Sequence, residues 1–213
     1  MNLDPHNWSP LSVEGIAEIL KGISVPWWVA GGWALDLFVG RTTRAHDDID
    51  VLILRRDQLA AQKHLSDWKL FKTKQPTPPH LAPWPKGEFL EPPINDVWAR
   101  SDLHAGPWRF QLMLMEADGD RWVYRRLPTI GGNIADMGLT TDAGIPCLAP
   151  EIQLLYKSGT GLQKDTDDLL NVLPLLSPRQ AEWLLKCLRR QYSDGHAWVG
   201  LLESRAGPGE PED

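Results

Sequence analysis

The sequence predicts an α+β protein in which a mixed sheet with flanking helices precedes a C-terminal helical domain. The first half alternates helix-like and strand-like segments and then continues as a run of strands, whereas the pattern from Pro150 onward is helical. This order favours an α/β core followed by a bundle of helices. We expect the core to span residues 1–145, the helical domain 146–205 and a flexible acidic tail 206–213.

The composition excludes several classes of protein. Hydrophobic residues make up 42% of the 213 positions and charged residues 23%, which is typical of a soluble globular protein. The formal net charge of -6 argues against a general nucleic-acid binder, which normally presents a basic face. The sequence has no apolar stretch long enough to span a bilayer, and its N-terminus does not resemble a signal peptide. We therefore expect a cytoplasmic protein without a membrane partner.

The first half of the chain shows clear secondary-structure signals. Apolar residues at helical spacing predict three helices, and Gly40 suits the C-cap of the second. Runs of bulky apolar residues predict two buried strands between these helices. The helices are expected at 11–22, 31–40 and 55–68, and the strands at 26–30 and 47–54.

The second half begins with a proline-rich segment, 75–93, which predicts an irregular surface excursion because proline cannot donate a ladder hydrogen bond. Alternating and β-branched residues then predict three strands, the last two joined by a hairpin turn at 117–120. Pro174 is expected to end or kink a helix, and Ser177 suits an N-cap. The strands are expected at 94–100, 107–116 and 120–126, and the helices at 150–159, 164–176 and 177–192.

Two carboxylates, Asp48 and Asp50, stand at the mouth of the strand that follows the second helix. Because side chains on a strand alternate, both are expected on one face about 6–7 Å apart, where like charges repel. Mg²⁺ is typically held by one or two carboxylates together with substrate phosphates, so a bound cation turns this repulsion into attraction. The other interpretation is a solvated, Asp-rich turn.

A glycine pair, Gly31-Gly32, lies between a predicted strand and a predicted helix. Glycine lets backbone N–H groups approach phosphate oxygens, and a helix N-terminus favours negative charge. A glycine pair is also compatible with an ordinary tight turn. The glycines and the carboxylates on neighbouring segments together favour a nucleotide site.

The segment GGWALDLFVGRTTRAHDDIDV, residues 31–51, resembles the nucleotide-binding core of aminoglycoside 2''-adenylyltransferases and of related lincosamide-modifying enzymes. These belong to the DNA polymerase β-like nucleotidyltransferase superfamily. The resemblance is dense over residues 26–56 and continues more loosely through the later strands and the first helices after Pro150. It implies a polymerase β-like nucleotidyltransferase core followed by a C-terminal helical domain.

The resemblance also implies site residues. Asp48 and Asp50 would be the ligands of Mg²⁺, with two ions expected, and Gly31 and Gly32 would cradle the triphosphate of ATP. The resemblance further suggests three basic residues of the nucleotide site, Arg44, His46 and Lys157.

These basic residues have other interpretations. Arg44 and His46 could instead fix the loop, and Lys157 could be a solvated residue at a helix end. We interpret Asp36 and Arg41 as a structural pair. Residues 164, 165 and 168 are compatible with an exposed i,i+4 charge cluster.

The sequence departs from the superfamily pattern at one position. The superfamily usually has a third carboxylate there, which often acts as the base for the acceptor hydroxyl. Gln111 stands at the equivalent position, and an amide cannot take a proton at physiological pH. Asp96 is the preferred substitute, and Asp102 and Glu116 are the alternatives. The remaining interpretations are that the base is dispensable or that catalysis is weak.

The acceptor is expected to enter between the core and the helices, bordered by segment 75–93. Gln111 could bind its hydroxyl, and Trp84 is the best candidate to stack on it or on adenine. Glu88 and Glu91, with Asp96 and Asp102, would make the entrance acidic and attract cations. The alternative is a solvated acidic loop without a ligand.

The sequence therefore predicts a magnesium-dependent nucleotidyltransferase that moves AMP from ATP to a hydroxyl of a small, cationic acceptor such as an aminoglycoside or a lincosamide. Such an activity would be compatible with antibiotic resistance. The first alternative is a nucleotide- or metal-binding protein of the same fold with weak or no transferase activity, which Gln111 motivates. A second alternative is a transferase that acts on a protein. The negative net charge disfavours RNA as the acceptor.

Overall fold

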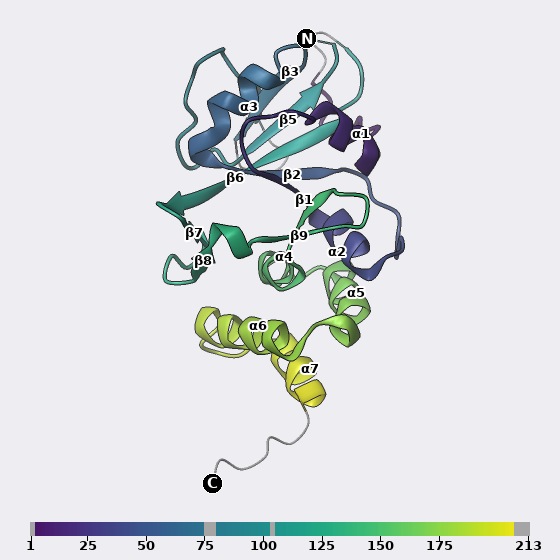
Figure 1. The fold of residues 1–213 in the computed structure, drawn as a ribbon, viewed down its shortest axis with the longest axis vertical. Coiled ribbons are helices and arrows are strands. Elements are labelled where there is room, and N and C mark those ends of the chain that lie inside the picture. The colour runs from purple at the N-terminus through teal and green to yellow at the C-terminus, as the bar shows by residue number, and fades with distance from the viewer. Residues whose placement is uncertain (1–2, 75–79, 103–104, 207–213) are drawn as a thin grey trace.

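The computed structural model describes residues 3–74, 80–102 and 105–206. A mixed sheet forms one part of the molecule, and the last helices form the other. Figure 1 shows β3 and β5 at one end and α6 and α7 at the opposite end, next to the C-terminus. The expected order of a mixed sheet followed by helices is confirmed.

The helices and strands of the first half lie close to where the sequence predicts them. Ser12 caps α1 by accepting from the Gly15 N–H, and α2 ends at Gly40, whose φ of +80° is left-handed. The helical elements are α1 (Val13–Ile19), α2 (Gly31–Val39), η1 (Arg55–Asp57) and α3 (Gln58–His64), and the two strands are β1 (Trp27–Ala30) and β2 (Asp50–Leu54).

The sheet contains more strands than the sequence predicts. Residues 80–83, expected to be irregular, form a strand because their backbone pairs with β3, while residues 75–79 lie outside the described part of the chain. The further strands are β3 (Lys69–Lys74), β4 (His80–Pro83), β5 (Asp96–Arg100), β6 (Phe110–Asp118), β7 (Arg121–Val123), β8 (Gly131–Asn133), β9 (Gly138–Thr140) and β10 (Pro146–Leu148). The main path runs β4-β3-β5-β6-β2-β1-β10-β9.

The register of the central strands brings distant residues onto one face. Antiparallel β1 places Ala30 opposite Asp50, and parallel β6 places Gln111 on the other side of Asp50. Antiparallel β5 then places Trp98 opposite Gln111. Directly opposed residues share a face, so these side chains line the same side of the sheet. Asp48 lies in the loop two residues before β2, not in the strand itself.

The two faces of β2 differ sharply. Ile49, Val51 and Ile53 are fully buried on the face opposite Asp50. The Asp50 face is partly covered by α4 (Pro150–Lys157), whose Tyr156 hydroxyl donates to Sδ of Met115 at 3.1 Å. β2 therefore lies between a hydrophobic core and the first helix of the helical part.

The helical part begins at Pro150, after β10 has paired with β1, so the sheet extends beyond the expected limit at residue 145. Ser177 forms a capping box with Gln180, and Pro174 interrupts the helical path as expected. The remaining elements are α5 (Gln163–Val172), η3 (Leu173–Leu175), α6 (Pro178–Gln191) and α7 (Ala197–Ala206). The expected tail lies, beyond Ala206, outside the described residues.

In the described ranges of the chain, no helix combines the length and the apolar character needed to cross a membrane.

Candidate active site

The two carboxylates of the sequence motif have no side-chain partner in the part of the chain that the structure describes. Within the described residues, neither the Asp48 nor the Asp50 side chain forms a hydrogen bond or an ion pair. Burial, together with repulsion from Asp48 and Asp96, raises the pKa of Asp50 from its ordinary value of 3.8 to about 8. Lys157 and Lys164 oppose this shift, so both lie within electrostatic reach of Asp50. A cation bound at the pair would stabilise it.

The glycine pair is required by the side chains that pack against it. Gly31 has a φ of +66°, and a Cβ there would lie closer than 3.0 Å to Oδ2 of Asp50. A Cβ on Gly32 would lie equally close to the His46 ring and to Nη2 of Arg44. The Gly31 N–H donates to Oε1 of Gln153 on α4 at 2.8 Å, so this donor is already used. The first turn of α2 has no side-chain cap.

The loop between α2 and β2 is held by Asp36. Its Oδ1 accepts from the backbone N–H of Thr43 at 3.1 Å and from the Thr43 hydroxyl at 2.5 Å, and its Oδ2 lies 2.6 Å from Nε2 of His46. The His46 ring packs against Trp33 with centroids 4.5 Å apart. The Trp33 indole N–H donates to the Asp48 carbonyl at 3.1 Å. These contacts fix the backbone that presents Asp48.

The expected pairing of Asp36 with Arg41 is wrong. Both oxygens of Asp36 are engaged by Thr43 and His46, and Arg41 is exposed. The His46 side chain is only 2% exposed, which supports the interpretation that this residue fixes the loop.

A buried charge network joins this loop to the helical part. Arg44 donates from Nε and Nη2 to the two oxygens of Asp168 on α5, at 2.9 and 3.1 Å. Nζ of Lys157 lies 2.6 Å from Asp165 and 2.9 Å from Asp168. Asp165 and Asp168 are each 2% exposed, so the expected exposed charge cluster is wrong for these two residues, although Lys164 is exposed. Lys157 is likewise buried and not solvated, because both aspartates surround its ammonium group.

Gln111, the residue that departs from the superfamily pattern, forms hydrogen bonds with both its amide oxygen and its amide nitrogen. Oε1 of Gln111 accepts from the Trp98 indole N–H at 2.7 Å, and its Nε2 donates to Oδ1 of Asp96 at 3.2 Å. Burial raises the pKa of Asp96, while Arg125, Arg55 and the Gln111 amide lower it. Asp96 and Gln111 therefore lie together, on the same side of the sheet as Asp50.

The other candidate bases are placed differently. Glu116 is paired with Arg55, at the end of β2 opposite Asp50. Asp102 is exposed and accepts from the Ala105 N–H at 3.0 Å. Of the three candidates, Asp96 is the one whose charge acts on Asp50.

The four carboxylates of the expected acidic entrance lie on different parts of the fold, and Asp96 is the one whose charge acts on Asp50. Arg55 anchors the segment after Glu88 by donating to the carbonyls of Leu90 and Ile94 at 2.8 and 2.7 Å. Five residues of extended strand separate Asp50 from Arg55, about 16 Å. Glu88 is also neutralised by Lys72, whose Nζ lies 2.6 Å from it. Glu91 is exposed on the same segment.

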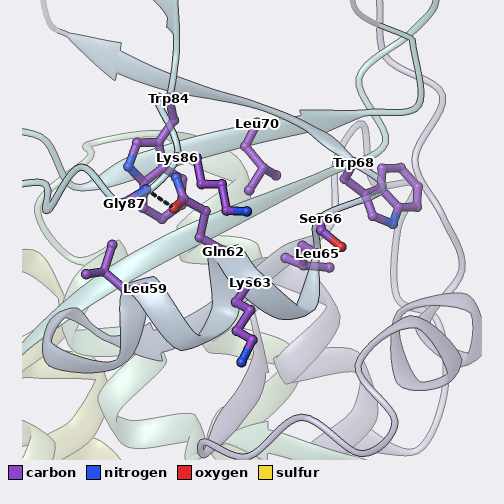
Figure 2. Close-up of a pocket in the computed structure, with 10 residues that line it drawn as sticks. All are labelled: Leu59, Gln62, Lys63, Leu65, Ser66, Trp68, Leu70, Trp84, Lys86 and Gly87. Atoms are coloured by element: carbon purple, nitrogen blue, oxygen red, sulfur yellow. Dashed lines mark hydrogen bonds between the residues drawn. The ribbon is translucent and has the colours of Figure 1, made fainter.

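Trp84, expected to stack on a ligand of the carboxylate site, belongs to the core. It is 6% exposed, and its indole N–H donates to the Glu88 carbonyl at 2.8 Å. Figure 2 shows it above α3 on the wall of a separate pocket of about 560 Å³, whose lining includes Leu59, Gln62 and Trp68 but none of the site carboxylates.

The structure adds residues that no sequence motif indicates. Gln153, Tyr156 and Arg125 line a small cavity of about 20 Å³ with Leu52 and Met113, on the Asp50 face. Their separation along the chain from the motif residues hides this relationship in the sequence.

The side-chain chemistry suits a cation that shares its ligands with a substrate. Within the described ranges, no group of three or more His, Cys, Asp or Glu side chains is arranged to hold a metal ion. The carboxylates of Asp48 and Asp50, which have no partner among the described residues, are the ligand type that Mg²⁺ prefers, and phosphate oxygens complete such sites.

Comparisons with known proteins agree with the motif. A family model described as aminoglycoside-2''-adenylyltransferase matches residues 12–78. A 2''-aminoglycoside nucleotidyltransferase of Escherichia coli is 50% identical over 40 residues, which cover 18% of this chain and 23% of that protein. The chain thus matches about a quarter of that relative's length. A lincosamide resistance protein of Staphylococcus haemolyticus is 28% identical over 161 residues, covering 74% of this chain and 89% of that protein.

Solved structures extend the likeness to most of the chain. The lincomycin-bound lincosamide antibiotic adenylyltransferase LnuA gives a TM-score of 0.53 at 20% identity, covering 80% of this chain and 99% of that one. The solution structure of ANT(2'')-Ia gives 0.54 at 14% identity, covering 85% and 91%. These comparisons confirm the expected resemblance to aminoglycoside- and lincosamide-modifying nucleotidyltransferases and the polymerase β-like fold.

Proposed function

We propose that this chain, which carries the aminoglycoside-2''-adenylyltransferase motif on a polymerase β-like nucleotidyltransferase fold, transfers AMP from ATP to a hydroxyl group of a small acceptor. The observation that supports this most is the contrast among the acidic residues of the site. Asp36, Asp165 and Asp168 are engaged by basic or hydroxyl groups, whereas the side chains of Asp48 and Asp50 have no partner in the described part of the chain.

Asp48 and Asp50 would hold Mg²⁺, with two ions proposed. Bound there, the metal would polarise the α-phosphate and offset the charge that develops on pyrophosphate. The frame formed by Asp36, His46 and Trp33 would keep Asp48 in place before substrate arrives, and the pairing of β2 with its neighbours would do the same for Asp50. Such preorganisation avoids reordering the ligands during the reaction.

The triphosphate would lie between the start of α2 and the helical part. Gly31 and Gly32 allow close approach of the backbone, and the uncapped first turn of α2 offers N–H donors. Because Gln153 occupies the Gly31 N–H, the following amides are the proposed donors. Arg44 would face the phosphates while Asp168 keeps it oriented, and the buried Lys157, whose charge acts on Asp50, would add positive charge behind it.

The chemical step needs a base for the acceptor. The acceptor oxygen attacks the α-phosphorus, the bond to pyrophosphate breaks, and the hydroxyl proton passes to a carboxylate. We assign this proton to Asp96, which is a carboxylate on the Asp50 face next to Gln111. Use of ATP as donor fits the cytoplasmic location expected from the sequence.

Transfer of label from [α-³²P]ATP tests the function. With Mg²⁺ and a panel containing lincomycin, tobramycin and other hydroxylated antibiotics, we expect a labelled acceptor and released pyrophosphate. The matched control is Asp50→Asn, which keeps the side-chain volume and should abolish transfer. Label on lysate proteins in place of the antibiotics would support a protein acceptor. Tight ATP binding without transfer to any acceptor would contradict the proposed activity and favour a nucleotide-binding role.

A further inference from the structure

Gln111 forms the centre of a three-residue hydrogen-bonded relay across β5 and β6. Its carbonyl oxygen accepts from the Trp98 indole N–H at 2.7 Å, and its amide nitrogen donates to the Asp96 carboxylate at 3.2 Å. Trp98 lies directly opposite Gln111 in the register, and Gln111 lies directly opposite Asp50. The relay therefore runs from an aromatic cluster on β5 to the strand that neighbours Asp50.

The tryptophan end of the relay is immobilised by other rings. Trp98 makes an edge contact with Trp8 at 4.9 Å between centroids and another with Trp108 at 5.4 Å. Trp108 is 1% exposed. These contacts hold the ring with its indole N–H toward Gln111, and this donor determines which end of the amide carries the oxygen.

The chemistry of the relay requires an amide at position 111. A glutamine accepts from Trp98 with its oxygen and donates to Asp96 with its nitrogen at the same time. A glutamate of the same size would still accept from Trp98, but it has no donor for Asp96. Its charge would instead face the Asp96 carboxylate and repel it. An apolar residue would leave the indole N–H and one Asp96 oxygen without their partner.

We propose that Trp98 and Gln111 are positioning residues that hold the Asp96 carboxylate beside the Asp48–Asp50 pair. The proposal rests on the proposed transferase function, and it places the base of that reaction on β5 with an amide support on β6. In this arrangement Gln111 supports the Asp96 carboxylate on the neighbouring strand and does not itself bind the acceptor hydroxyl.

Gln111→Glu gives the sharpest test. A supporting role of Gln111 predicts a lower kcat in this variant, whereas a base at position 111 predicts an equal or higher kcat. If Gln111 supports Asp96, the variant should lower kcat about tenfold or more, with ATP KM and Mn²⁺ affinity within about twofold of wild type. If position 111 is instead the natural place of the base, the new carboxylate should maintain or raise kcat. Unchanged or increased kcat would overturn the proposal.

A double-mutant cycle separates positioning from general stability. Trp98→Phe removes the indole N–H and keeps an aromatic ring, and it should lower kcat in the wild type but have almost no further effect in Asp96→Asn. Residues that act only on folding would give additive effects instead, and that result would contradict the relay. Trp68→Phe serves as the control, since Trp68 packs on Phe110 at 4.9 Å and takes no part in the relay.

A measurement that needs no turnover distinguishes failure of the relay from failure of the function. In ¹⁵N spectra of the full chain, Trp98→Phe and Asp96→Asn should each shift the Gln111 side-chain amide signals, and Trp68→Phe should not. Unshifted Gln111 signals would overturn the relay. Shifted signals in a protein that transfers AMP to no acceptor would retain the relay and reject the transferase.

Discussion

Gly31 and Asp50 are packed so closely that a Cβ on the glycine would lie closer than 3.0 Å to Oδ2 of the aspartate. Gly31→Ala must therefore displace the Asp50 carboxylate in addition to straining a left-handed backbone. We expect a loss of stability larger than the roughly 1–2 kcal/mol that such strain alone costs, together with weaker Mn²⁺ binding. Thermal unfolding and Mn²⁺ titration check both effects.

Gly40→Ala is the matched control for this variant. Gly40 has a φ of +80° but nothing within 4 Å of its Cβ position, so it should show the strain without the displacement. Equal metal affinity in the two glycine variants would contradict the account of Gly31.

The raised pKa of Asp50 predicts a pH-dependent stability in the absence of divalent metal. Its folded-state pKa is about 8, whereas its ordinary value is 3.8. Between these values the folded protein keeps a proton that the unfolded chain has lost, so this contribution to stability falls as pH rises. Asp50→Asn removes the effect. Its Tm should match wild type near pH 4 and exceed it near pH 8 by about 3 °C or more, roughly 1 kcal/mol for a protein of this size.

Melting curves at several pH values with EDTA provide this test. If the Tm difference between Asp50→Asn and wild type does not change with pH, burial and the neighbouring carboxylates do not raise the pKa of Asp50. Addition of Mg²⁺ at pH 8 should stabilise the wild type more than Asp50→Asn, because metal binding removes the need for the proton.

Trp33 is expected to act on the metal site through the backbone of Asp48. Trp33→Phe keeps a ring against His46 but loses the 3.1 Å indole hydrogen bond to the Asp48 carbonyl. We expect Mn²⁺ affinity to fall several-fold with a stability change of about 1 kcal/mol, the usual size for one hydrogen bond.

Trp84→Phe also loses one indole hydrogen bond to a carbonyl, that of Glu88, far from the carboxylates. It should lower Tm and leave Mn²⁺ affinity and acceptor KM unchanged. A higher acceptor KM in Trp84→Phe would restore Trp84 as a ligand contact.

Asp168 connects the motif loop to both helices of the charge network. Asp168→Asn leaves Arg44 and Lys157 without one buried counter-charge, and breaking a buried pair in this way typically costs about 3–5 kcal/mol. Asp167→Asn alters the exposed neighbour, which accepts from Gln163, and should change stability by less than about 0.5 kcal/mol. Denaturant unfolding of both variants checks the contrast. Similar midpoints for the two would mean that the network contributes no stability.

The sequence allowed the motif and the longer elements to be predicted because their signals are local. Apolar spacing indicates α1 and α2, and the Ser177 box marks the start of α6. Short strands such as β8 carry too few residues for a periodic pattern and form only because a partner strand is present.

Burial of charge was the main feature that the sequence could not reveal. Asp165 and Asp168 have the spacing of a solvated helix face, yet Arg44, more than a hundred residues away, and Lys157 make their burial possible. The same holds for Gln153, which contacts Gly31 across 122 positions. Trp84 was misassigned because its proline-rich surroundings resemble an exposed loop, whereas Gln62 and Gln58 bind that loop to α3.

Calorimetric titration of a non-hydrolysable α,β-methylene ATP analogue, with and without Mg²⁺, tests the central claim most directly. The account predicts tight binding by the wild type in the presence of Mg²⁺ and much weaker binding without it. Asp48→Asn and Asp50→Asn should lose the Mg²⁺-dependent part while remaining folded, at a Tm equal to or above that of the metal-free wild type. Mg²⁺-dependent binding that survives in both variants, or a marked loss of fold stability in either, would show that the two aspartates are structural and not metal ligands.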